Sequence, residues 1–498
     1  MPTPSPWHRF LNTTQIRPLY THPPSGLKWR SNTAFILITI GIALFTDLFL
    51  YGLLVPVLPF MLEDRAGVPD DQIQSYTSGL LAIYAASSVI ACPVAGIVAD
   101  RVSTRQAPFL LGLAVLLGAT VLLFLGTSVP VLVVARVLQG ISSGVVWTIG
   151  LALCVETVGP KNLGKTIGTL FSFLSAGALW APMIGGILYK KAGYIGVLGI
   201  SFAILIIDFV LRVLVIEKKV AHRYAVQDAN SNYTPSTTPH ASSPNHENDP
   251  GDDNESQPLL AKRNEEEAEL YRLPPQKSRL ARIAPIIPCF ANPSLLTSQW
   301  LALVQGIILG SADATVTTVS RELFGFDSMK AGLLFLPIGL VDLFVGPIAG
   351  WIIDRRGTKL VSVVAFVYLT PVLVLFRLVH AGGLDQQLLY GGLLGLLGAG
   401  LSGFGAISVV EAGAVVEKYH HYNVDFFGES GPYAQLYGLN GMLFNLGLAV
   451  GPELAGELKE AIGYGNMNIV LAAICGGTAV LCYLYIGGKP KILQRGTK

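Results

Sequence analysis

Long stretches of apolar residues recur along the chain, separated by short polar, charged or glycine- and proline-rich segments. A helix needs about 20 residues to cross ~30 Å of hydrocarbon, and twelve stretches approach or exceed that length. We therefore expect an all-α membrane protein with twelve spans. Their approximate ranges are 33–59, 75–99, 107–126, 130–153, 166–189, 194–216, 294–318, 330–353, 360–379, 387–411, 433–456 and 467–486.

A polar segment divides these spans into two sets of six. Its centre, NSNYTPSTTPHASSPNHENDPGDDNESQPLL at 230–260, is rich in proline, serine and asparagine. Such a composition buries too little apolar surface to offset the entropy of folding, so we expect a largely disordered cytoplasmic linker. The predicted organisation is an N-terminal tail (1–32), a six-helix bundle (33–216), the linker (217–293), a second six-helix bundle (294–486) and a C-terminal tail (487–498).

The two halves contain matching segments in the same order. CPVAGIVADRVSTR at 92–105 aligns with GPIAGWIIDRRGTK at 346–359 at a constant offset of 254. GALWAPMIGGILYKKAGY at 177–194 aligns with GLAVGPELAGELKEAIGY at 447–464 at an offset of 270. A tandem repeat of six spans is typical of secondary transporters, in which the binding site lies between the halves near the midplane of the bilayer.

Composition and charge support this interpretation. The chain is 51% hydrophobic and 13% charged, against ~25% charged residues in soluble domains. Because short cytoplasmic loops carry an excess of Lys and Arg, the positions of the basic residues predict that both termini are cytoplasmic. The polar, proline-rich N-terminus has no early apolar core and does not resemble a cleavable signal peptide. A net charge of +2 gives no reason to expect a nucleic-acid partner.

The five cysteines and eight histidines predict neither a disulfide framework nor a metal site. Four of the cysteines fall inside expected spans or at the end of one, and the histidines lie outside the spans or at their ends. No His/Cys cluster has the spacing of metal ligands. We therefore expect a protein that is not an enzyme and holds no metal or cofactor, with a membrane enzyme as a remote alternative.

The first span contains a single charged residue. In GIALFTDLFLYGLLVPVLPF at 41–60, only Asp47 is charged, and about 1.5 Å per residue from Thr33 places it ~21 Å deep, near the midplane. An ionised aspartate at that depth costs at least ~2.5 kcal/mol, so it needs a proton, a cation or a water-filled cavity. We interpret Asp47 as a proton- and substrate-binding group; a hydrogen bond that merely joins two helices is the alternative.

Three further spans contain charged residues. Arg136 cannot lose its charge in the bilayer and needs polar partners in a cavity, unless it reaches the outer headgroups. Asp208 and Arg212 are four residues apart on one helix face and favour a structural pair, although a functional role stays open. Asp313 follows GIILGSA much as Asp47 follows GIALFT, so we expect it to be the counterpart of Asp47 in the second half.

Weaker candidates complete the set of polar and aromatic residues in the spans. Two carboxylates, Asp342 and Glu411, offer less evidence of function, and Glu411 lies near a cytoplasmic end where it could be solvated. Four aromatic residues would either line a central cavity or pack between helices. These are Phe45, Tyr84, Trp147 and Trp180.

Three short motifs resemble those of the major facilitator superfamily. GIVADRVSTRQ at 96–106 resembles its cytoplasmic loop motif G-x-x-x-D-R-x-x-x-R, and RVLQG at 136–140 is similar to the motif of proton-coupled members that contains a buried arginine. APMIGG at 181–186 is similar to the antiporter motif of the fifth span. Asp47 followed by Pro56 and Pro59 resembles the first span of vesicular amine transporters and of fungal multidrug-type drug:proton antiporters, and EAGAVVEKYH in span ten is similar to the fungal branch.

The resemblance covers nearly the whole chain and implies roles for named residues. It implies a twelve-helix, monomeric antiporter driven by the proton gradient, which moves small organic, cationic or amphipathic compounds by alternating access. The implied conformational latch comprises Gly96, Asp100, Arg101, Arg105, Asp354 and Arg355, and the antiporter motif comprises Gly177, Pro182, Gly185 and Gly186. The sequence departs from the pattern at Ala181, where the antiporter motif has glycine, and at Asn440 and Gly441, where amine carriers have an acid.

Two questions of function and location stay open at the level of sequence. A nutrient symporter or facilitator, or a non-transporting sensor or scaffold on the same fold, is an alternative to the antiporter. In the linker, ESQPLL matches the acidic dileucine pattern E-x-x-x-L-L through Glu255, Leu259 and Leu260. This pattern favours a vacuolar or endosomal membrane, with the plasma membrane as the rival.

Overall fold

The computed structural model describes most of the chain as helices. The described residues are 24–54, 57–102, 104–159, 162–231, 270–274, 279–326, 330, 333–402, 404–428 and 431–487, and they contain no strand. The predicted sorting residues Glu255, Leu259 and Leu260 lie outside these ranges, as does Pro56.

The N-terminal half contains six long helical segments. Its fifth and sixth spans are two helices that meet within α8 at Gly193, whose φ of 59° and ψ of −155° form a backbone conformation that is readily available only to glycine. The elements are α2 (Leu27–Arg30), α3 (Thr33–Leu54), α4 (Leu58–Asp64), α5 (Asp70–Arg101), α6 (Gln106–Leu125), α7 (Val129–Val158), α8 (Leu163–Leu214) and α9 (Lys218–Ser231).

The C-terminal half repeats this plan. Its first long helix begins at Pro293, and the Asn292 side chain accepts a hydrogen bond from the Ser294 amide (2.9 Å), which caps the helix. The elements are α11 (Arg279–Ile283), η2 (Ile287–Ala291), α12 (Pro293–Phe324), α14 (Phe335–Arg356), α15 (Thr358–Leu375), η3 (Phe376–Leu378), α16 (Leu384–Leu401), α17 (Phe404–Tyr422), α18 (Val424–Phe427), α19 (Tyr433–Ile462) and α20 (Tyr464–Tyr485).

The expected all-α architecture with twelve spans is confirmed. Eleven helical stretches of the described residues are long and apolar enough to cross a bilayer, with α16 and α17 counted as one stretch. Helix α19 provides the twelfth: it has 30 residues, but its polar residues, including Asn440, Asn445 and Glu453, make it less apolar than the others.

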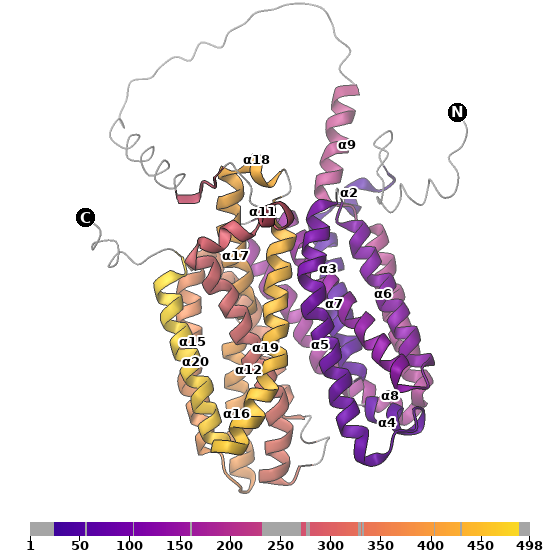
Figure 1. Ribbon diagram of the computed structural model, residues 1–498, viewed down its shortest axis with the longest axis vertical. Helices are drawn as coiled ribbons and strands as arrows, with labels where there is room; N and C mark the ends of the chain where they lie inside the picture. Colours follow the sequence, from indigo (N-terminus) through magenta and orange to yellow (C-terminus); the bar gives the residue numbers. More distant parts are fainter. Residues whose placement is uncertain are drawn as a thin grey trace, which may run out of the picture.

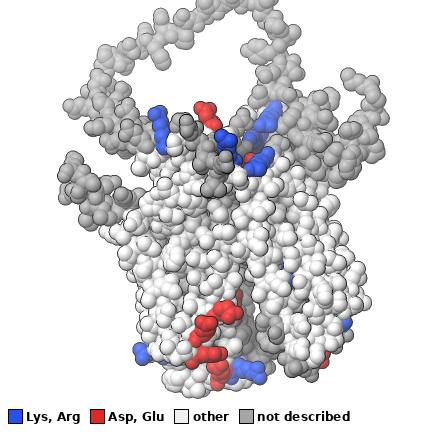
Figure 2. Space-filling model, in the orientation of Figure 1, with Lys and Arg blue, Asp and Glu red and all other residues white. Residues whose placement is uncertain are grey.

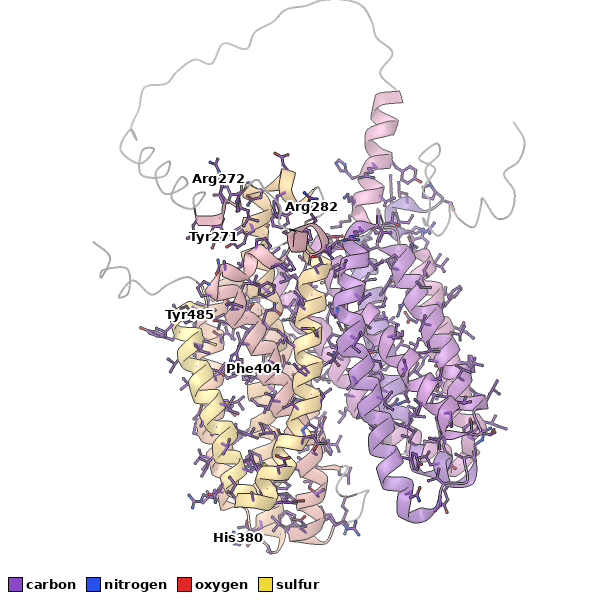
Figure 3. The ribbon with its side chains drawn as sticks, viewed as in Figure 1. Tyr271, Arg272, Arg282, His380, Phe404 and Tyr485 are labelled. Carbon is purple, nitrogen blue, oxygen red and sulfur yellow. The ribbon has the colours of Figure 1, made fainter. Side chains whose placement is uncertain are left out.

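The two six-helix halves stand side by side with both ends of the described chain at the same end of the bundle (Figure 1). We call this end the terminal face and the opposite end the far face. Tyr271 and Arg282 lie at the terminal face, His380 at the far face, and Phe404 in the interior of the C-terminal half, stacked on Phe366 at 4.0 Å (Figure 3). Figure 2 shows charged side chains mainly at the two ends of the visible surface, as a bilayer requires.

Two pairs of helices make the most extensive contacts between the halves. Helix α5 packs against α19, and α8 packs against α14. Both contacts are close because glycines face backbone: a Cβ on Gly96 would lie 2.5 Å from the Ala434 carbonyl oxygen, and one on Gly350 would lie 2.2 Å from that of Gly164. We call these two contacts the α5–α19 seam and the α8–α14 seam.

Parts of the predicted linker are ordered. Residues 218–231 form α9, and residues 279–291 form α11 and η2 at the terminal face. The Asn423 side chain accepts from the Leu273 amide (2.9 Å) and donates to the Tyr271 carbonyl (2.8 Å), which anchors this segment to the end of α17. The second described end of the linker therefore docks on the bundle, whereas α9 projects from the terminal face (Figure 1).

Candidate functional site

Asp47 lies in α3 with its carboxyl buried among polar side chains. It is 1% exposed, and three donors converge on Oδ2. Ser143 Oγ donates at 2.6 Å, Trp147 Nε1 at 3.3 Å, and the Tyr84 hydroxyl is 3.4 Å away. The one hydroxyl proton of Tyr84 is shared between Asp47 Oδ2 and Ser143 Oγ, which is the nearer acceptor at 2.9 Å, so the serine proton is left to point to Asp47.

The second oxygen of the same carboxyl has no partner. Asp47 Oδ1 is buried and accepts no hydrogen bond from any described residue, although buried polar atoms are normally satisfied. Oδ2 is held in place by its three donors, so Oδ1 is the atom that remains for a proton or for a cationic group of a ligand. The arrangement fits a group that binds and releases, and a purely structural carboxyl would be satisfied at both oxygens.

Arg136 lies farther along the same interior, in α7. Its side chain is fully buried, with Nε donating to the Leu80 carbonyl (3.2 Å) and Nη1 to Gln139 Oε1 (2.7 Å). The guanidinium lies over the rings of Tyr51 and Tyr84, 5.3 and 5.2 Å from their centroids, a cation–π geometry. Arg136 therefore reaches Asp47 through Tyr84, and the alternative that it extends to outer headgroups is wrong.

The second half places its carboxylates differently from the sequence-based expectation. At about 1.5 Å per residue, Asp313 lies ~30 Å from the terminal-face end of α12, some 9 Å beyond the depth of Asp47. Its side chain is accessible on the described bundle, whereas that of Asp47 is buried. Asp342 lies ~21 Å from the terminal-face end of α14, at the depth of Asp47. Asp342, and not Asp313, therefore lies at the depth of Asp47, although it belongs to the second span of its half and Asp47 to the first.

Asp208 and Arg212 form a closed pair within the second part of α8. Arg212 Nε and Nη2 bind the two carboxylate oxygens at 2.8 and 2.6 Å, and both side chains are fully buried. Nη1 donates to the Phe109 carbonyl (3.0 Å), and the guanidinium lies 4.1 Å from the centre of that ring. Because the charges are fully paired with each other, this geometry favours the structural interpretation.

Asp100 joins the halves at the terminal face. Its two carboxylate oxygens accept from the amides of Ala434 (3.0 Å) and Gln435 (2.9 Å), in the first turn of α19. Free amides and the helix dipole make a helix N-terminus a favourable place for a negative charge. The contact is possible because Gly96, one turn earlier on α5, lets the two backbones approach.

Asp354 makes the equivalent contact in the second repeat. Its carboxylate accepts from the amides of Gly164 (2.7 Å) and Lys165 (2.8 Å), in the first turn of α8. In each repeat, an aspartate of one half thus caps a helix of the other half. We call these two contacts the aspartate latches.

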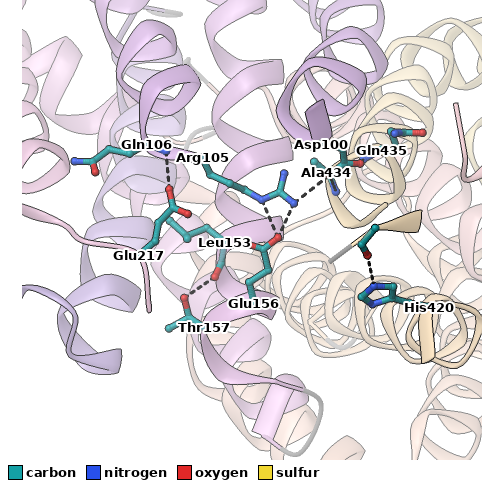
Figure 4. A network of polar contacts seen from close by, with 11 residues as sticks. Asp100, Arg105, Gln106, Leu153, Glu156, Thr157, Glu217, His420, Ala434 and Gln435 are labelled. Atoms are coloured by element: carbon teal, nitrogen blue, oxygen red, sulfur yellow. Dashed lines mark hydrogen bonds and ion pairs between the residues drawn. The ribbon is translucent and has the colours of Figure 1, made fainter. Parts of the chain in front are cut away.

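Arg105 extends the first latch into a charge network (Figure 4). Its guanidinium bonds Asp100 at 3.0 Å and Glu156 at 2.9 and 2.5 Å. Burial alone would lower the pKa of Arg105, but the charges of Glu156 and Asp100 raise it above the usual value, so the guanidinium stays charged. Glu217 accepts from the Gln106 amide (2.9 Å) beside it. Sequence reasoning missed Glu156 and Glu217, since nothing local marks them.

Two other predicted latch residues lie apart from these contacts. Arg101 is exposed and donates to the Ile283 carbonyl of α11 at 3.3 Å, which crosses from one half to the other. The Arg355 guanidinium lies 4.3 Å from the ring centre of Trp351 on its own helix.

The predicted antiporter motif packs the fifth span against α3. A Cβ on Gly185 would lie 2.5 Å from the Leu53 carbonyl oxygen, and Gly177 faces Phe45. Ala181, where the motif usually has glycine, faces Gly52 of α3, so a glycine on the partner helix leaves room for its methyl group. Pro182 lies inside the helix, and Gly186 faces open space.

Trp147 connects Asp47 to the other half, whereas Trp180 is exposed. The Trp147 ring stacks on the Phe444 ring of α19 with centroids 6.1 Å apart. It also meets the Phe171 ring edge-on with centroids 6.0 Å apart. Both Trp147 and Phe444 are eleven residues, or ~16 Å, from the terminal-face ends of their helices. The pair therefore lies one turn closer to the terminal face than Asp47.

Glu411 is not solvated at its helix end, so that expectation is wrong. The side chain is 6% exposed and accepts from Ser294 Oγ (2.5 Å), the Gly487 amide (3.0 Å) and the Thr358 hydroxyl. It joins the first turns of α12 and α15 to the end of α20, which is a structural role.

Two short patterns typical of enzymes occur in the chain without the structure that would make them functional. GPKNLGKT at 159–166 matches the phosphate-binding loop pattern, which needs a preceding strand and free amides, but it follows α7, and its Gly164 and Lys165 amides are bound to Asp354. GISSG at 140–144 matches the nucleophile-elbow pattern, but it lies in the middle of α7.

The close approach at Gly350 leads to a testable expectation. In Gly350→Ala the new methyl group would meet the Gly164 carbonyl oxygen at 2.2 Å, and such overpacking costs about 1–3 kcal/mol. The strain exists only while the α8–α14 seam is closed, so the balance of states should shift toward one open at the terminal face by roughly 5- to 100-fold. Cysteine labelling from each side of the membrane measures that balance.

Gly392→Ala is the matched control, because a Cβ there meets nothing within 4 Å. It should label like the wild type. Equal labelling of Gly350→Ala and Gly392→Ala would mean that the seam does not separate during the cycle.

Comparison with known proteins assigns the family. Residues 40–426 match the model of the Major Facilitator Superfamily. The chain is 39% identical over 480 residues to the MFS-type transporter ppzB of Metarhizium rileyi, covering 94% of this chain and 97% of that protein. A shorter match, 30% identical and covering 32% of this chain and 33% of the other, is to a probable vesicular acetylcholine transporter-B of Danio rerio.

A solved structure shares the fold. The human organic anion transporter MFSD10 superposes with a TM-score of 0.64 over 93% of this chain and all of that chain, at 18% identity. The resemblance inferred from the motifs is thereby confirmed.

Proposed function

The chain belongs to the major facilitator superfamily and is a multi-pass membrane transporter, and on this premise we propose that it exchanges protons for small organic cations or amphipathic compounds. The observation that carries the proposal is the Asp47 carboxyl, buried at the midplane with Oδ2 held by three donors and Oδ1 without a partner. The match to vesicular acetylcholine transporters supports a cationic substrate, since acetylcholine is an organic cation.

Asp47 would act by binding a proton and a cation in alternation. The ionised carboxylate attracts a cation, and aromatic faces nearby favour such a ligand. Protonation removes the charge and releases the cation, so the two ligands compete for one group. This competition couples their movement in opposite directions.

The described state supports an alternating-access cycle. The hydrogen bonds between the halves that involve Asp100 and Asp354 lie at the terminal face, where they join the two halves. We place the terminal face in the cytoplasm, from the distribution of Lys and Arg. The state would then be closed to the cytoplasm and open to the lumen or the exterior.

Trp147 and Phe444 supply the inner gate of this cycle. Their stacked rings lie between Asp47 and the terminal face and come from opposite halves. Because the Trp147 indole N–H also donates to Asp47, a change of charge at Asp47 would act directly on the gate.

A transport assay in proteoliposomes tests the proposal. Purified protein, an imposed pH gradient and a panel of organic cations, neutral amphipathic compounds and sugars would be used, with internal pH and substrate followed together. We expect a cation to move against the proton flux. Movement of a sugar with the proton flux would instead identify a nutrient symporter, and substrate flux without any proton flux would identify a facilitator.

The predicted sorting signal gives an expectation about location. If Leu259 and Leu260 are read by a sorting receptor, changing both to Ala should move the protein from an internal membrane to the plasma membrane. Transport by the purified variant should equal that of the wild type, because the signal lies outside the two bundles. Fluorescence microscopy of the tagged proteins measures the shift, and an unchanged location would refute the signal.

A further inference from the structure

Asp342 is a carboxyl in the α8–α14 seam that the cycle described above does not use. The seam is built turn by turn from facing residues: Gly164 meets Gly350, Gly168 meets Gly346, and Leu179 meets Gly339. Between the last two contacts, Ser175 Oγ of the N-terminal half donates to Asp342 Oδ2 of the C-terminal half. This hydrogen bond crosses between the halves at the depth of Asp47.

The surroundings of Asp342 hold hydroxyls and no facing charge among the described residues. The Ser402 hydroxyl also lies near the carboxyl and donates to the Gly398 carbonyl at 2.7 Å. The charged residues of the helices that pack on α14 lie near helix ends or are bound elsewhere. They are Lys165, Lys191, Asp208 and Arg212 on α8, Lys359 on α15, Asp385 on α16, and Glu411, Glu417, Lys418, His420 and His421 on α17; those of α14 itself are Asp354, Arg355 and Arg356, at its terminal-face end.

The other seam lacks such a group. The repeat offset of 254 places Ser88 of α5 at the position of Asp342, and the offset of 270 places Asn445 of α19 at the position of Ser175. Neither of these side chains titrates. The two seams are alike in their glycines and aspartate latches. Among the described residues they differ in that a carboxyl lies at the midplane of the α8–α14 seam, whereas the matching positions of the α5–α19 seam carry none.

We propose that Asp342 is a second proton-carrying group of the transport cycle, linked to the movement of the halves by its hydrogen bond to Ser175. This inference rests on the proposed proton coupling and adds to it a proton that does not compete with substrate at Asp47. The carboxylate takes up a proton from the compartment at the far face while the latches hold the terminal face closed. It releases that proton on the terminal side after the seam has separated.

The hydroxyl of Ser175 lets the carboxyl titrate without breaking the seam. Ser175 Oγ also lies 3.1 Å from the Phe171 carbonyl oxygen, so its one proton has two acceptors. When Asp342 is ionised, that proton points to the carboxylate. When Asp342 is protonated, its own O–H can donate to Ser175 Oγ, and the serine proton turns to Phe171. The contact survives in both states, and separation of the halves removes it from both.

The test is the number of protons exchanged per substrate in Asp342→Asn. The amide keeps the shape and can still accept from Ser175, but it carries no proton through the cycle. In proteoliposomes clamped at zero membrane potential, the pH difference that balances a fixed substrate gradient should increase, about twofold if the count falls from two protons to one. Asp385→Asn, an exposed aspartate at the start of α16, is the matched control and should balance like the wild type.

Ser175→Ala provides a second measurement that does not depend on how Asp342→Asn folds. This variant should exchange the wild-type number of protons per substrate, because the Asp342 carboxyl remains. Its pH of half-maximal transport should shift, because the hydroxyl that donates to the carboxylate is absent. An Asp342→Asn protein with the wild-type balance point, or a Ser175→Ala protein with the wild-type pH profile, would overturn this inference alone. A wild type that moves substrate without protons would overturn the proposed function as well.

Discussion

Asp47→Asn is expected to abolish proton-coupled transport while the protein still folds and reaches its membrane. The amide oxygen can replace Oδ2 as acceptor for Ser143 and Trp147, so the local hydrogen bonds are largely kept. The charge and the titration are lost. Removing one member of a buried charge pair costs about 2–5 kcal/mol, so affinity for a cationic substrate should fall at least ~30-fold.

Two measurements on purified protein check this expectation. Binding of a cationic substrate, followed by titration calorimetry at fixed pH, should weaken in the variant and become independent of pH. Substrate-driven proton movement in proteoliposomes should fall to the level of empty liposomes. Asp385→Asn controls for the effect of the same substitution outside the bundle interior. Wild-type coupling in Asp47→Asn would exclude this carboxyl as the coupling group.

The spans and the repeat could be predicted from sequence because the bilayer imposes them. A backbone in hydrocarbon must satisfy its own hydrogen bonds, so an apolar stretch of sufficient length becomes a helix. The Asp100 and Asp354 segments could be matched because the same contact, an aspartate capping a helix of the other half, recurs in each repeat. In both cases the physical requirement lies in consecutive residues.

The carboxyl of the second half that lies at the depth of Asp47 could not be predicted in this way. Asp313 follows a similar local sequence, but depth depends on where its helix begins, and α12 begins at Pro293 and runs for 32 residues. Little in the sequence indicated that Asp342 has a function, because its partner, Ser175, is 167 residues away. Glu411 looked solvated for the same reason, since its partners come from the ends of three other helices.

The partners of Asp47 and Arg105 also depend on tertiary packing. Ser143 and Trp147 are one helical turn apart on α7, and their alignment with Asp47 follows from how α7 packs against α3. Glu156 lies at the terminal-face end of the same helix, where only the fold brings it to Arg105. The helical periodicity of polar residues along α7 could have indicated the partners of Asp47. Ser143, Trp147 and the Arg136 motif fall on one side of a helix whose polar residues are buried.

The double variant Asp100→Asn, Asp354→Asn should move the protein strongly toward a state open at the terminal face. A carboxylate at a helix N-terminus contributes up to about 2 kcal/mol in partly buried geometry, and each latch places one carboxylate on two amides. If each substitution removes about 1–2 kcal/mol from the closed state only, the ratio of the two states should change by ~30-fold or more. Each single variant should show roughly the square root of that change, because the latches lie in separate seams.

The expected consequence for transport is a slower cycle with the same substrate preference, because the latches lie at the terminal face and Asp47 lies ~21 Å deeper. Labelling of single cysteines placed on each side of the bundle, with turnover measured on the same samples, separates the two effects. Arg101→Gln is a useful comparison, because it removes a charge next to Asp100. The Arg101 side chain is exposed and donates to the Ile283 carbonyl across the halves. A double variant that labels like the wild type would show that the closed state is held by the glycine seams alone, and one that changes substrate preference would place the latches in contact with the binding site.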